Sequence, residues 1–220
     1  MLHKQTTSPE LFQVLKILMS LPELSSFRLV GGTALSLLRG HRISEDIDMF
    51  TDQTYGTTDF VAIEQVIKEK FPVVDNYADA FPRLKAMENN LGLYLYVGSN
   101  EQDLIKTDIL YWDAPFLFGA LAEEGIRLAS VEEIGAMKLD VISRGGRKKD
   151  FWDLVEILPD YSLPHLLRVY KEKYPYNDLA DVKRGLSDFL AAEEGPDPIC
   201  LRKRTWESVK EVIIRQTAQL

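Results

Sequence analysis

The hydrophobic positions of this chain recur with helical spacing in two N-terminal segments. Leu11, Leu15 and Leu18 share one side of a helix predicted over residues 8–21, and a similar stripe predicts a second helix over residues 59–70. We interpret both as packing helices that bury one face against the rest of the protein.

Other segments alternate between apolar and polar residues, which is typical of strands with one buried face. The segments Arg83–Met87 and Leu91–Tyr96, on either side of residues 88–90, are interpreted as a hairpin. The remaining predicted strands lie at residues 27–30, around Asp46 and Asp48, at residues 104–111 and at residues 126–129.

From Ser130 onward the pattern is helical. Ser130 and Glu133 have the spacing of a capping box at the start of a helix. Residues 163–220, punctuated by prolines, predict three more helices. We therefore expect an α/β (α+β) core over residues 1–129 and a helical C-terminal region, residues 130–220, packed on that core.

Two glycines and two aspartates suggest chemistry within this framework. Asp46 and Asp48 project from the same face of one strand, where carboxylates about 5 Å apart repel by roughly 3 kcal/mol. Such a pair persists where a cation binds or water screens both groups, and oxygen ligands without His or Cys suit Mg²⁺. Gly31 and Gly32 precede a helix, where backbone N–H groups can bind a phosphate and the Thr33 hydroxyl can add a donor.

Two further side chains each have a functional and a structural interpretation. If its strand pairs beside the Asp46–Asp48 strand, Asp108 joins the acidic cluster; otherwise it is an exposed aspartate paired with Lys106. Lys138 lies at the centre of an apolar helix face and needs an anion, which a triphosphate in a cleft would supply. The alternative for Lys138 is a side chain that reaches solvent from the edge of a packed helix.

Taken separately, a Gly-Gly turn or an Asp-x-Asp strand end is usually structural. Together, a glycine pair followed at this distance by alternating hydrophobic and Asp positions resembles the signature of the polymerase-β-like nucleotidyltransferases. The segment GGTALSLLRGHRISEDIDMF is most similar to the AbiEii/AbiGii-type abortive-infection toxins of bacteria. Lys138 and the later Lys149-Asp150 pair also match that family, and the resemblance covers most of residues 27–158.

The resemblance implies a nucleotidyltransferase core of mixed sheet and flanking helices, followed by a helical region. It implies that Asp108 helps to activate an acceptor hydroxyl and that Lys138 neutralises the triphosphate as pyrophosphate leaves. Family members are toxins paired with an antitoxin, and some relatives modify transfer RNA, so an RNA or protein acceptor and a cognate antitoxin are expected partners. The implied ligands of two Mg²⁺ ions are Asp46, Asp48 and Asp108, and the implied nucleoside triphosphate site is Gly31, Gly32, Thr33, Lys138, Lys149 and Asp150.

Composition narrows the class of protein. The 220 residues are 45% hydrophobic and 27% charged, as in ordinary globular proteins, and the single cysteine, Cys200, excludes an internal disulfide. The net charge of −8 falls in residues 1–125, with 10 Lys and Arg against 18 Asp and Glu. Residues 126–220 are balanced and hold the basic clusters 144–149 and 202–204, and we expect a nucleic-acid partner to contact these clusters. No apolar run is long enough to span a bilayer, so we expect a cytoplasmic protein that binds no membrane.

Three other functions are compatible with these motifs. A nucleotidyltransferase that modifies a small molecule, such as an antibiotic, would carry the same residues. A metal-dependent glycosyltransferase also uses Asp-x-Asp, but would need neither the upstream glycines nor Lys138 and the Lys149-Asp150 pair. A catalytically silent toxin–antitoxin binding module would have no need to retain mutually repelling carboxylates.

Overall fold

The computed structural model describes residues 1–87 and 90–220, and its centre is one mixed sheet of seven strands in the order β3-β4-β5-β2-β1-β7-β6. All described strands lie before residue 129, and the helices α5 to α10 follow it; the domain boundary itself stays a prediction. The strands are β1 (Arg28–Leu29), β2 (Ile47–Thr51), β3 (Val73–Asn76), β4 (Gly92–Gly98), β5 (Ile105–Tyr111), β6 (Leu121–Glu123) and β7 (Ile126–Leu128).

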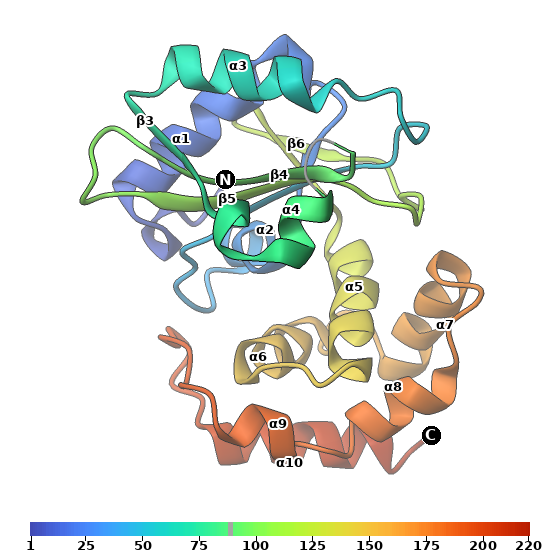
Figure 1. The fold of residues 1–220 in the computed structure, drawn as a ribbon. Coiled ribbons are helices and arrows are strands. Elements are labelled where there is room, and N and C mark those ends of the chain that lie inside the picture. Colours follow the sequence, from blue (N-terminus) through green and yellow to red (C-terminus); the bar gives the residue numbers. More distant parts are fainter. Residues whose placement is uncertain (88–89) are drawn as a thin grey trace.

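Helices cover both sides of the sheet. Figure 1 shows α1 and α3 on one side, and α2 with the helical C-terminal part on the other. No helix within residues 1–87 and 90–220 is long and apolar enough to cross a bilayer. The α-helices are α1 (Pro9–Ser20), α2 (Gly31–Arg39), α3 (Phe60–Lys70), α4 (Pro82–Met87), α5 (Val131–Ser143), α6 (Lys148–Ile157), α7 (Leu163–Lys173), α8 (Leu179–Gly185), α9 (Leu190–Glu193) and α10 (Trp206–Thr217), and short 3₁₀ turns are η1 (Lys4–Thr6), η2 (Pro22–Leu24) and η3 (Tyr77–Ala80).

Strand register sets the geometry of the acidic side chains. β2 runs parallel to β5, and Asp48 stands directly beside Asp108 in this pairing. The flanking residues Ile47, Met49 and Ile109 are fully buried, so the two aspartates point to the opposite face. The expectation that the Asp108 strand pairs beside the Asp48 strand is therefore confirmed.

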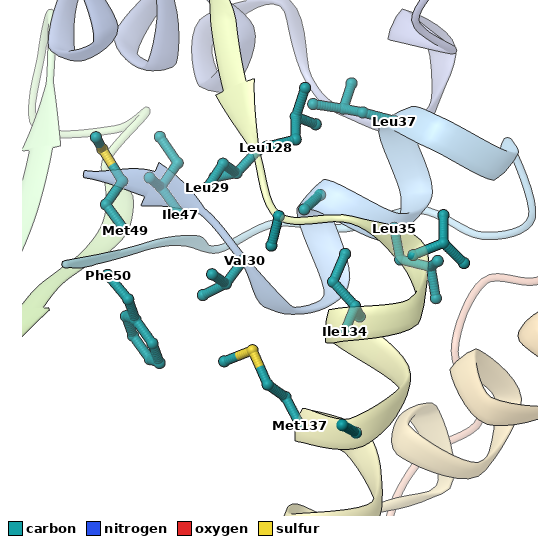
Figure 2. Close-up of a cluster of buried hydrophobic side chains, with 14 of the residues drawn as sticks. Leu29, Val30, Leu35, Leu37, Ile47, Met49, Phe50, Leu128, Ile134 and Met137 are labelled. Carbon is teal, nitrogen blue, oxygen red and sulfur yellow. The ribbon is translucent and has the colours of Figure 1, made fainter. Parts of the chain in front are cut away.

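The hydrophobic core joins the sheet to the helices on both faces. Ile47 and Met49 point toward the side of α1, whereas Val30 and Phe50 point toward α5 (Figure 2). There, Met137 of α5 points to the same side of the sheet as the Phe50 ring (Figure 2). The same α5 side chains that close the core thus bring the helical region up against the acidic face of the sheet.

Most helix predictions are confirmed, and one detail of the caps differs. Ser8 accepts a hydrogen bond from Leu11 N at 3.0 Å, and Ser130 accepts one from Glu133 N at 3.1 Å. The Glu133 side chain does not complete the expected capping box, because its carboxylate pairs instead with Lys173 at 2.7 Å. Both of these side chains are almost fully buried, so the pair fixes α5 to α7.

Two predictions about secondary structure are wrong. Residues 83–87 form part of the helix α4 and not the first strand of a hairpin, because Pro82 suits the first position of a helix and five alternating residues carry a weak signal. The turn expected at residues 88–90 lies mostly outside the described residues. In the C-terminal part, the structure has four helices, α7 to α10, where the sequence predicts three. The additional helix is α9, whose four residues are too few to leave a periodic pattern in the sequence.

A buried ionic network ties the loop between α2 and β2 to the helical region. Asp153 of α6 accepts hydrogen bonds from Arg42 Nε at 2.6 Å and Nη2 at 2.8 Å, and its Oδ1 atom lies 2.8 Å from His41 Nε2. Lys138 Nζ lies 2.6 Å from Asp153 and 2.7 Å from Asp150. Burial alone would raise the pKa of Asp153, but the charges of Lys138 and Arg42 hold it well below its usual range.

We predict that Asp153→Asn lowers the free energy of unfolding by about 3–5 kcal/mol, since two buried cations then share a single carboxylate. Urea-induced unfolding measures this change. Asp197→Asn is the matched control, because it breaks an exposed contact with Lys148 on the same helix and is expected to cost less than about 1 kcal/mol. Equal losses in the two variants would contradict the structural role of the network.

Candidate active site

A cavity of about 470 Å³ lies between the acidic face of the sheet and helix α5. Its charged lining combines carboxylates with basic side chains. The basic side chains come from the loop between α2 and β2, from β5, and from α5, α6 and the residues between these two helices. This mixture suits a ligand that carries both phosphates and bound cations. The charged residues are Arg42, Asp46, Asp48, Lys106, Asp108, Lys138, Asp140, Arg144, Arg147, Lys149 and Asp150.

The two glycines form the first turn of α2 at one wall of this cavity. Gly31 has a positive φ of 67°, and a Cβ atom at this position would stand 2.7 Å from Asp48 Oδ2. A Cβ atom on Gly32 would meet the Arg42 guanidinium at 2.1 Å. The residue before the helix is Val30, which provides no side-chain cap, so the N–H groups of the first turn remain available to a phosphate.

Thr33 does not present its hydroxyl to the cavity as the sequence suggested. The side chain is almost fully buried, and its hydroxyl hydrogen-bonds to Ser44 Oγ at 2.9 Å and to the backbone carbonyl of Asp46. The physical reason is that Gly31 and Gly32 belong to the helix, which turns the third residue toward the loop. Thr33 thus holds the loop that carries Asp46.

Each of the three aspartates has a defined charge environment in the cavity. Asp46, one residue before β2, lies 3.4 Å from Lys149 Nζ. Asp108 accepts a hydrogen bond from Lys106 at 2.6 Å through Oδ2 and one from the Tyr77 hydroxyl through Oδ1. The two interpretations of Asp108 therefore hold together: it pairs with Lys106, and it also belongs to the acidic cluster.

Asp48 is the aspartate whose charge is least compensated. Burial raises the pKa of Asp48 to about 6, and the negative charge of Asp108 adds to this shift. Lys106 and Lys138 act in the opposite direction without cancelling it. A divalent cation beside Asp48 would relieve this unfavourable charge.

The donor set fits Mg²⁺ in chemistry, although it is not preassembled as a cage. No group of three or more His, Cys, Asp or Glu side chains in metal-binding geometry occurs in the part of the chain that the structure describes. Lys106 and Lys149 occupy carboxylate oxygens of Asp108 and Asp46, so a metal would replace these contacts. Carboxylate oxygens are the ligands that hard cations require.

Lys138 and Asp150 line the cavity but are already paired with each other. The need of Lys138 for an anion, which motivated its assignment, is met by Asp150 and Asp153. The Asp150 carboxylate also accepts a hydrogen bond from Arg147 N at 3.0 Å at the start of α6. Lys149 is more accessible, with 31% of its side chain exposed, and thus better placed for a phosphate.

Sequence reasoning missed several residues of the site. Arg42, in the loop between the glycine and aspartate motifs, and Tyr77, on η3, gave no periodic signal. Asp153 did carry one, because it follows Asp150 by three positions on a helix and therefore shares its face. Trp112 and Tyr174 add aromatic surface to the lining of the cavity.

A comparison with known protein families identifies the family of this chain. The sequence model of the nucleotidyl transferase AbiEii toxin family, whose members are described as belonging to type IV toxin–antitoxin systems, matches residues 13–211. The chain belongs to this AbiEii family. As a member, it is a nucleotidyltransferase, and the family resemblance seen in the sequence is confirmed.

This AbiEii chain is similar to other proteins over almost its whole length. An uncharacterised protein of Aquifex aeolicus is 27% identical over 212 residues, which cover 94% of both chains. A crystal structure of a nucleotidyltransferase candidate from Helicobacter pylori has a TM-score of 0.59 at 20% identity, covering 99% of this chain and 92% of the other. MenT4, a nucleotidyltransferase toxin from Mycobacterium tuberculosis, has a TM-score of 0.59 at 16% identity, covering 96% and 82%. These structures confirm the expected nucleotidyltransferase fold.

The pKa of Asp48 yields a prediction about stability. Because the pKa of Asp48 is raised in the folded state, the fold favours the protonated carboxyl. The stability gained in this way is fully present below about pH 4 and is lost as the pH rises through about 6. Asp48→Asn removes the cost of the charged form. We therefore expect it to increase the free energy of unfolding by about 1–3 kcal/mol near pH 7.5, and by much less near pH 4.5.

Urea titrations at both pH values, without divalent cations, measure this difference. Asp75→Asn is the control, since it removes an exposed carboxylate from β3 and should change stability equally at both pH values. An Asp48→Asn variant that is less stable than the wild type near pH 7.5 would contradict the unfavourable charge assigned to Asp48.

Proposed function

We propose that this chain is the Mg²⁺-dependent toxin of a type IV toxin–antitoxin system, and that it transfers a nucleoside monophosphate from a nucleoside triphosphate to an RNA hydroxyl, with transfer RNA as the prime candidate. A cognate antitoxin would be its protein partner. The observation that carries the proposal is the register of β2 and β5, which sets Asp48 beside Asp108 at one wall of the cavity that the first turn of α2 also lines. Family membership supports the transfer chemistry.

In this proposal the phosphates bind to backbone N–H groups at the start of α2. Gly31 and Gly32 permit this approach because neither carries a side chain between the backbone and the cavity. Lys149, a partly exposed cation beside Asp46, and the exposed Arg147 both line the cavity and can compensate the triphosphate charge. Lys138, at the cavity wall, adds positive potential as pyrophosphate leaves, while Asp150 keeps it oriented.

Asp46, Asp48 and Asp108 would hold Mg²⁺, with two ions implied by the family. The metal supplies Lewis-acid activation of the phosphate and neutralises charge in the transition state. Asp108 has a second role, because it accepts the proton of the attacking hydroxyl as general base. Its contact with the Tyr77 hydroxyl supports this role, since a hydroxyl already donates a hydrogen bond to this carboxylate.

The acceptor would reach Asp108 from the open side of the cavity. Arg144 and Arg147 at this cavity have side chains that are 64% and 69% exposed, respectively. They belong to the basic cluster of residues 144–149, which can hold an RNA backbone electrostatically. This arrangement favours a polyanionic acceptor over a small antibiotic.

The experiment that tests this function uses the purified protein, Mg²⁺, each α-³²P-labelled nucleoside triphosphate in turn, and total bacterial RNA. We expect label on a small RNA with one preferred nucleotide. Asp48→Asn should reduce the rate by at least about 100-fold, which is the cost of losing one preorganised charged group. Because this variant is expected to be at least as stable as the wild type, its loss of activity could not be attributed to unfolding.

Each alternative function has its own result in this assay. Nucleotide binding by a thermal-shift measurement, without label on RNA or protein, would favour a small-molecule acceptor. Absence of both nucleotide binding and label would contradict the enzymatic function and favour a silent binding module. RNA labelling that persists in Asp48→Asn would contradict the assignment of the site.

A further inference from the structure

Tyr77 places a phenolic hydroxyl where an acceptor hydroxyl is needed. Its O–H donates a hydrogen bond to Oδ1 of Asp108, the carboxylate that serves as general base in the proposed function. Asp108 stands beside Asp48 in the paired strands. An acceptor that attacks a phosphate bound between Asp48 and the start of α2 must present its oxygen to Asp108, and the oxygen of Tyr77 is already there.

The surroundings fix this ring in place. Tyr77 belongs to η3, and its ring packs against Tyr94 at 5.9 Å and Tyr96 at 5.2 Å between ring centroids. Lys106 Nζ lies 5.0 Å from the centre of the Tyr77 ring and 2.6 Å from Asp108 Oδ2. The hydroxyl is therefore preorganised, with a base on one side and a cation next to the base.

We propose that Tyr77 is a self-nucleotidylation site, at which the protein transfers a nucleoside monophosphate to its own side chain. This inference rests on the proposed function, because it uses the same site and the same nucleoside triphosphate. The Tyr77 oxygen forms a bond to the α-phosphorus. The bond from the α-phosphorus to the bridging oxygen breaks, its electron pair leaves with pyrophosphate, and the phenolic proton passes to Asp108.

The modification has a consequence for the enzyme. A nucleotidylated Tyr77 no longer has a hydroxyl proton to donate, and its added phosphate stands next to Asp108 on the acceptor side. It thus prevents another acceptor from reaching this base. The helix α4 follows η3 directly and buries none of its side chains, so its displacement makes room for the product at little cost in packing. Self-nucleotidylation would therefore limit the activity of the protein.

The test uses the full chain with Mg²⁺ and each of the four nucleoside triphosphates, followed by intact-mass measurement and peptide mapping. The expected result is a gain of one nucleoside monophosphate, located on Tyr77. Tyr77→Phe should show no gain. Tyr96→Phe, the matched control from the same aromatic group, should keep the modification on Tyr77. Asp48→Asn should show none, which establishes that the protein itself performs the reaction.

RNA added in a parallel reaction separates this inference from the proposed function. Labelled RNA with unmodified Tyr77 would overturn the self-modification and leave the transferase intact. A nucleotide mapped to another residue, or an equal gain in Tyr77→Phe, would also overturn it. If neither RNA nor protein gains a nucleotide, although all four triphosphates are supplied, both proposals fail. Peptide mapping of the wild type decides the outcome even if Tyr77→Phe folds poorly.

Discussion

The arrangement of the site depends on the buried carboxylate of Asp153. Arg42 lies 111 positions away along the chain, yet its guanidinium binds this carboxylate through two nitrogens, and Lys138 binds it from α5. These contacts hold the loop before β2 against the helical region, so the glycine turn, Asp46 and Lys149 face one cavity. The Arg42 guanidinium also fills the space above Gly32, which explains why a side chain at that position is excluded. A buried network of this kind costs desolvation energy and contributes little net stability, but it fixes a geometry.

The acidic cluster has the opposite energetic character. Asp48 is half-buried beside another carboxylate, and the rise of its pKa to about 6 reflects a charged form that the fold disfavours. Lys106 and Lys149 partly compensate the neighbouring aspartates through contacts that a metal can replace. The charges of the Asp153 network are thus neutralised by one another and stabilise the position of the loop. The charges of the acidic cluster are incompletely neutralised, which leaves them available to a ligand. That separation is a physical basis for assigning the second set to chemistry.

The sequence allowed the fold and the acidic face to be predicted because both leave local periodic signals. Alternation around Asp48 and around Asp108 was enough to orient each side chain, although only their pairing, now observed, brings them together. The hydroxyl of Thr33 was misplaced because the sequence does not reveal whether a glycine pair forms a turn or the first turn of a helix. The contacts of Arg42 with Asp153 and of Tyr77 with Asp108 could not be predicted, since pairs between distant segments follow no period. The helix α4 was mistaken for a strand because a five-residue segment is too short to distinguish the two patterns.

A crystal structure with Mg²⁺ and a non-hydrolysable nucleoside triphosphate would test the central claim most directly. We expect metal between Asp46, Asp48 and Asp108, and phosphates against the backbone of Gly31 and Gly32. We also expect Lys138 to keep its contacts with Asp150 and Asp153, while Lys106 and Lys149 release their aspartates. A nucleotide bound elsewhere, or phosphates that draw Lys138 away from Asp153, would contradict the division between structural and ligand-binding charges.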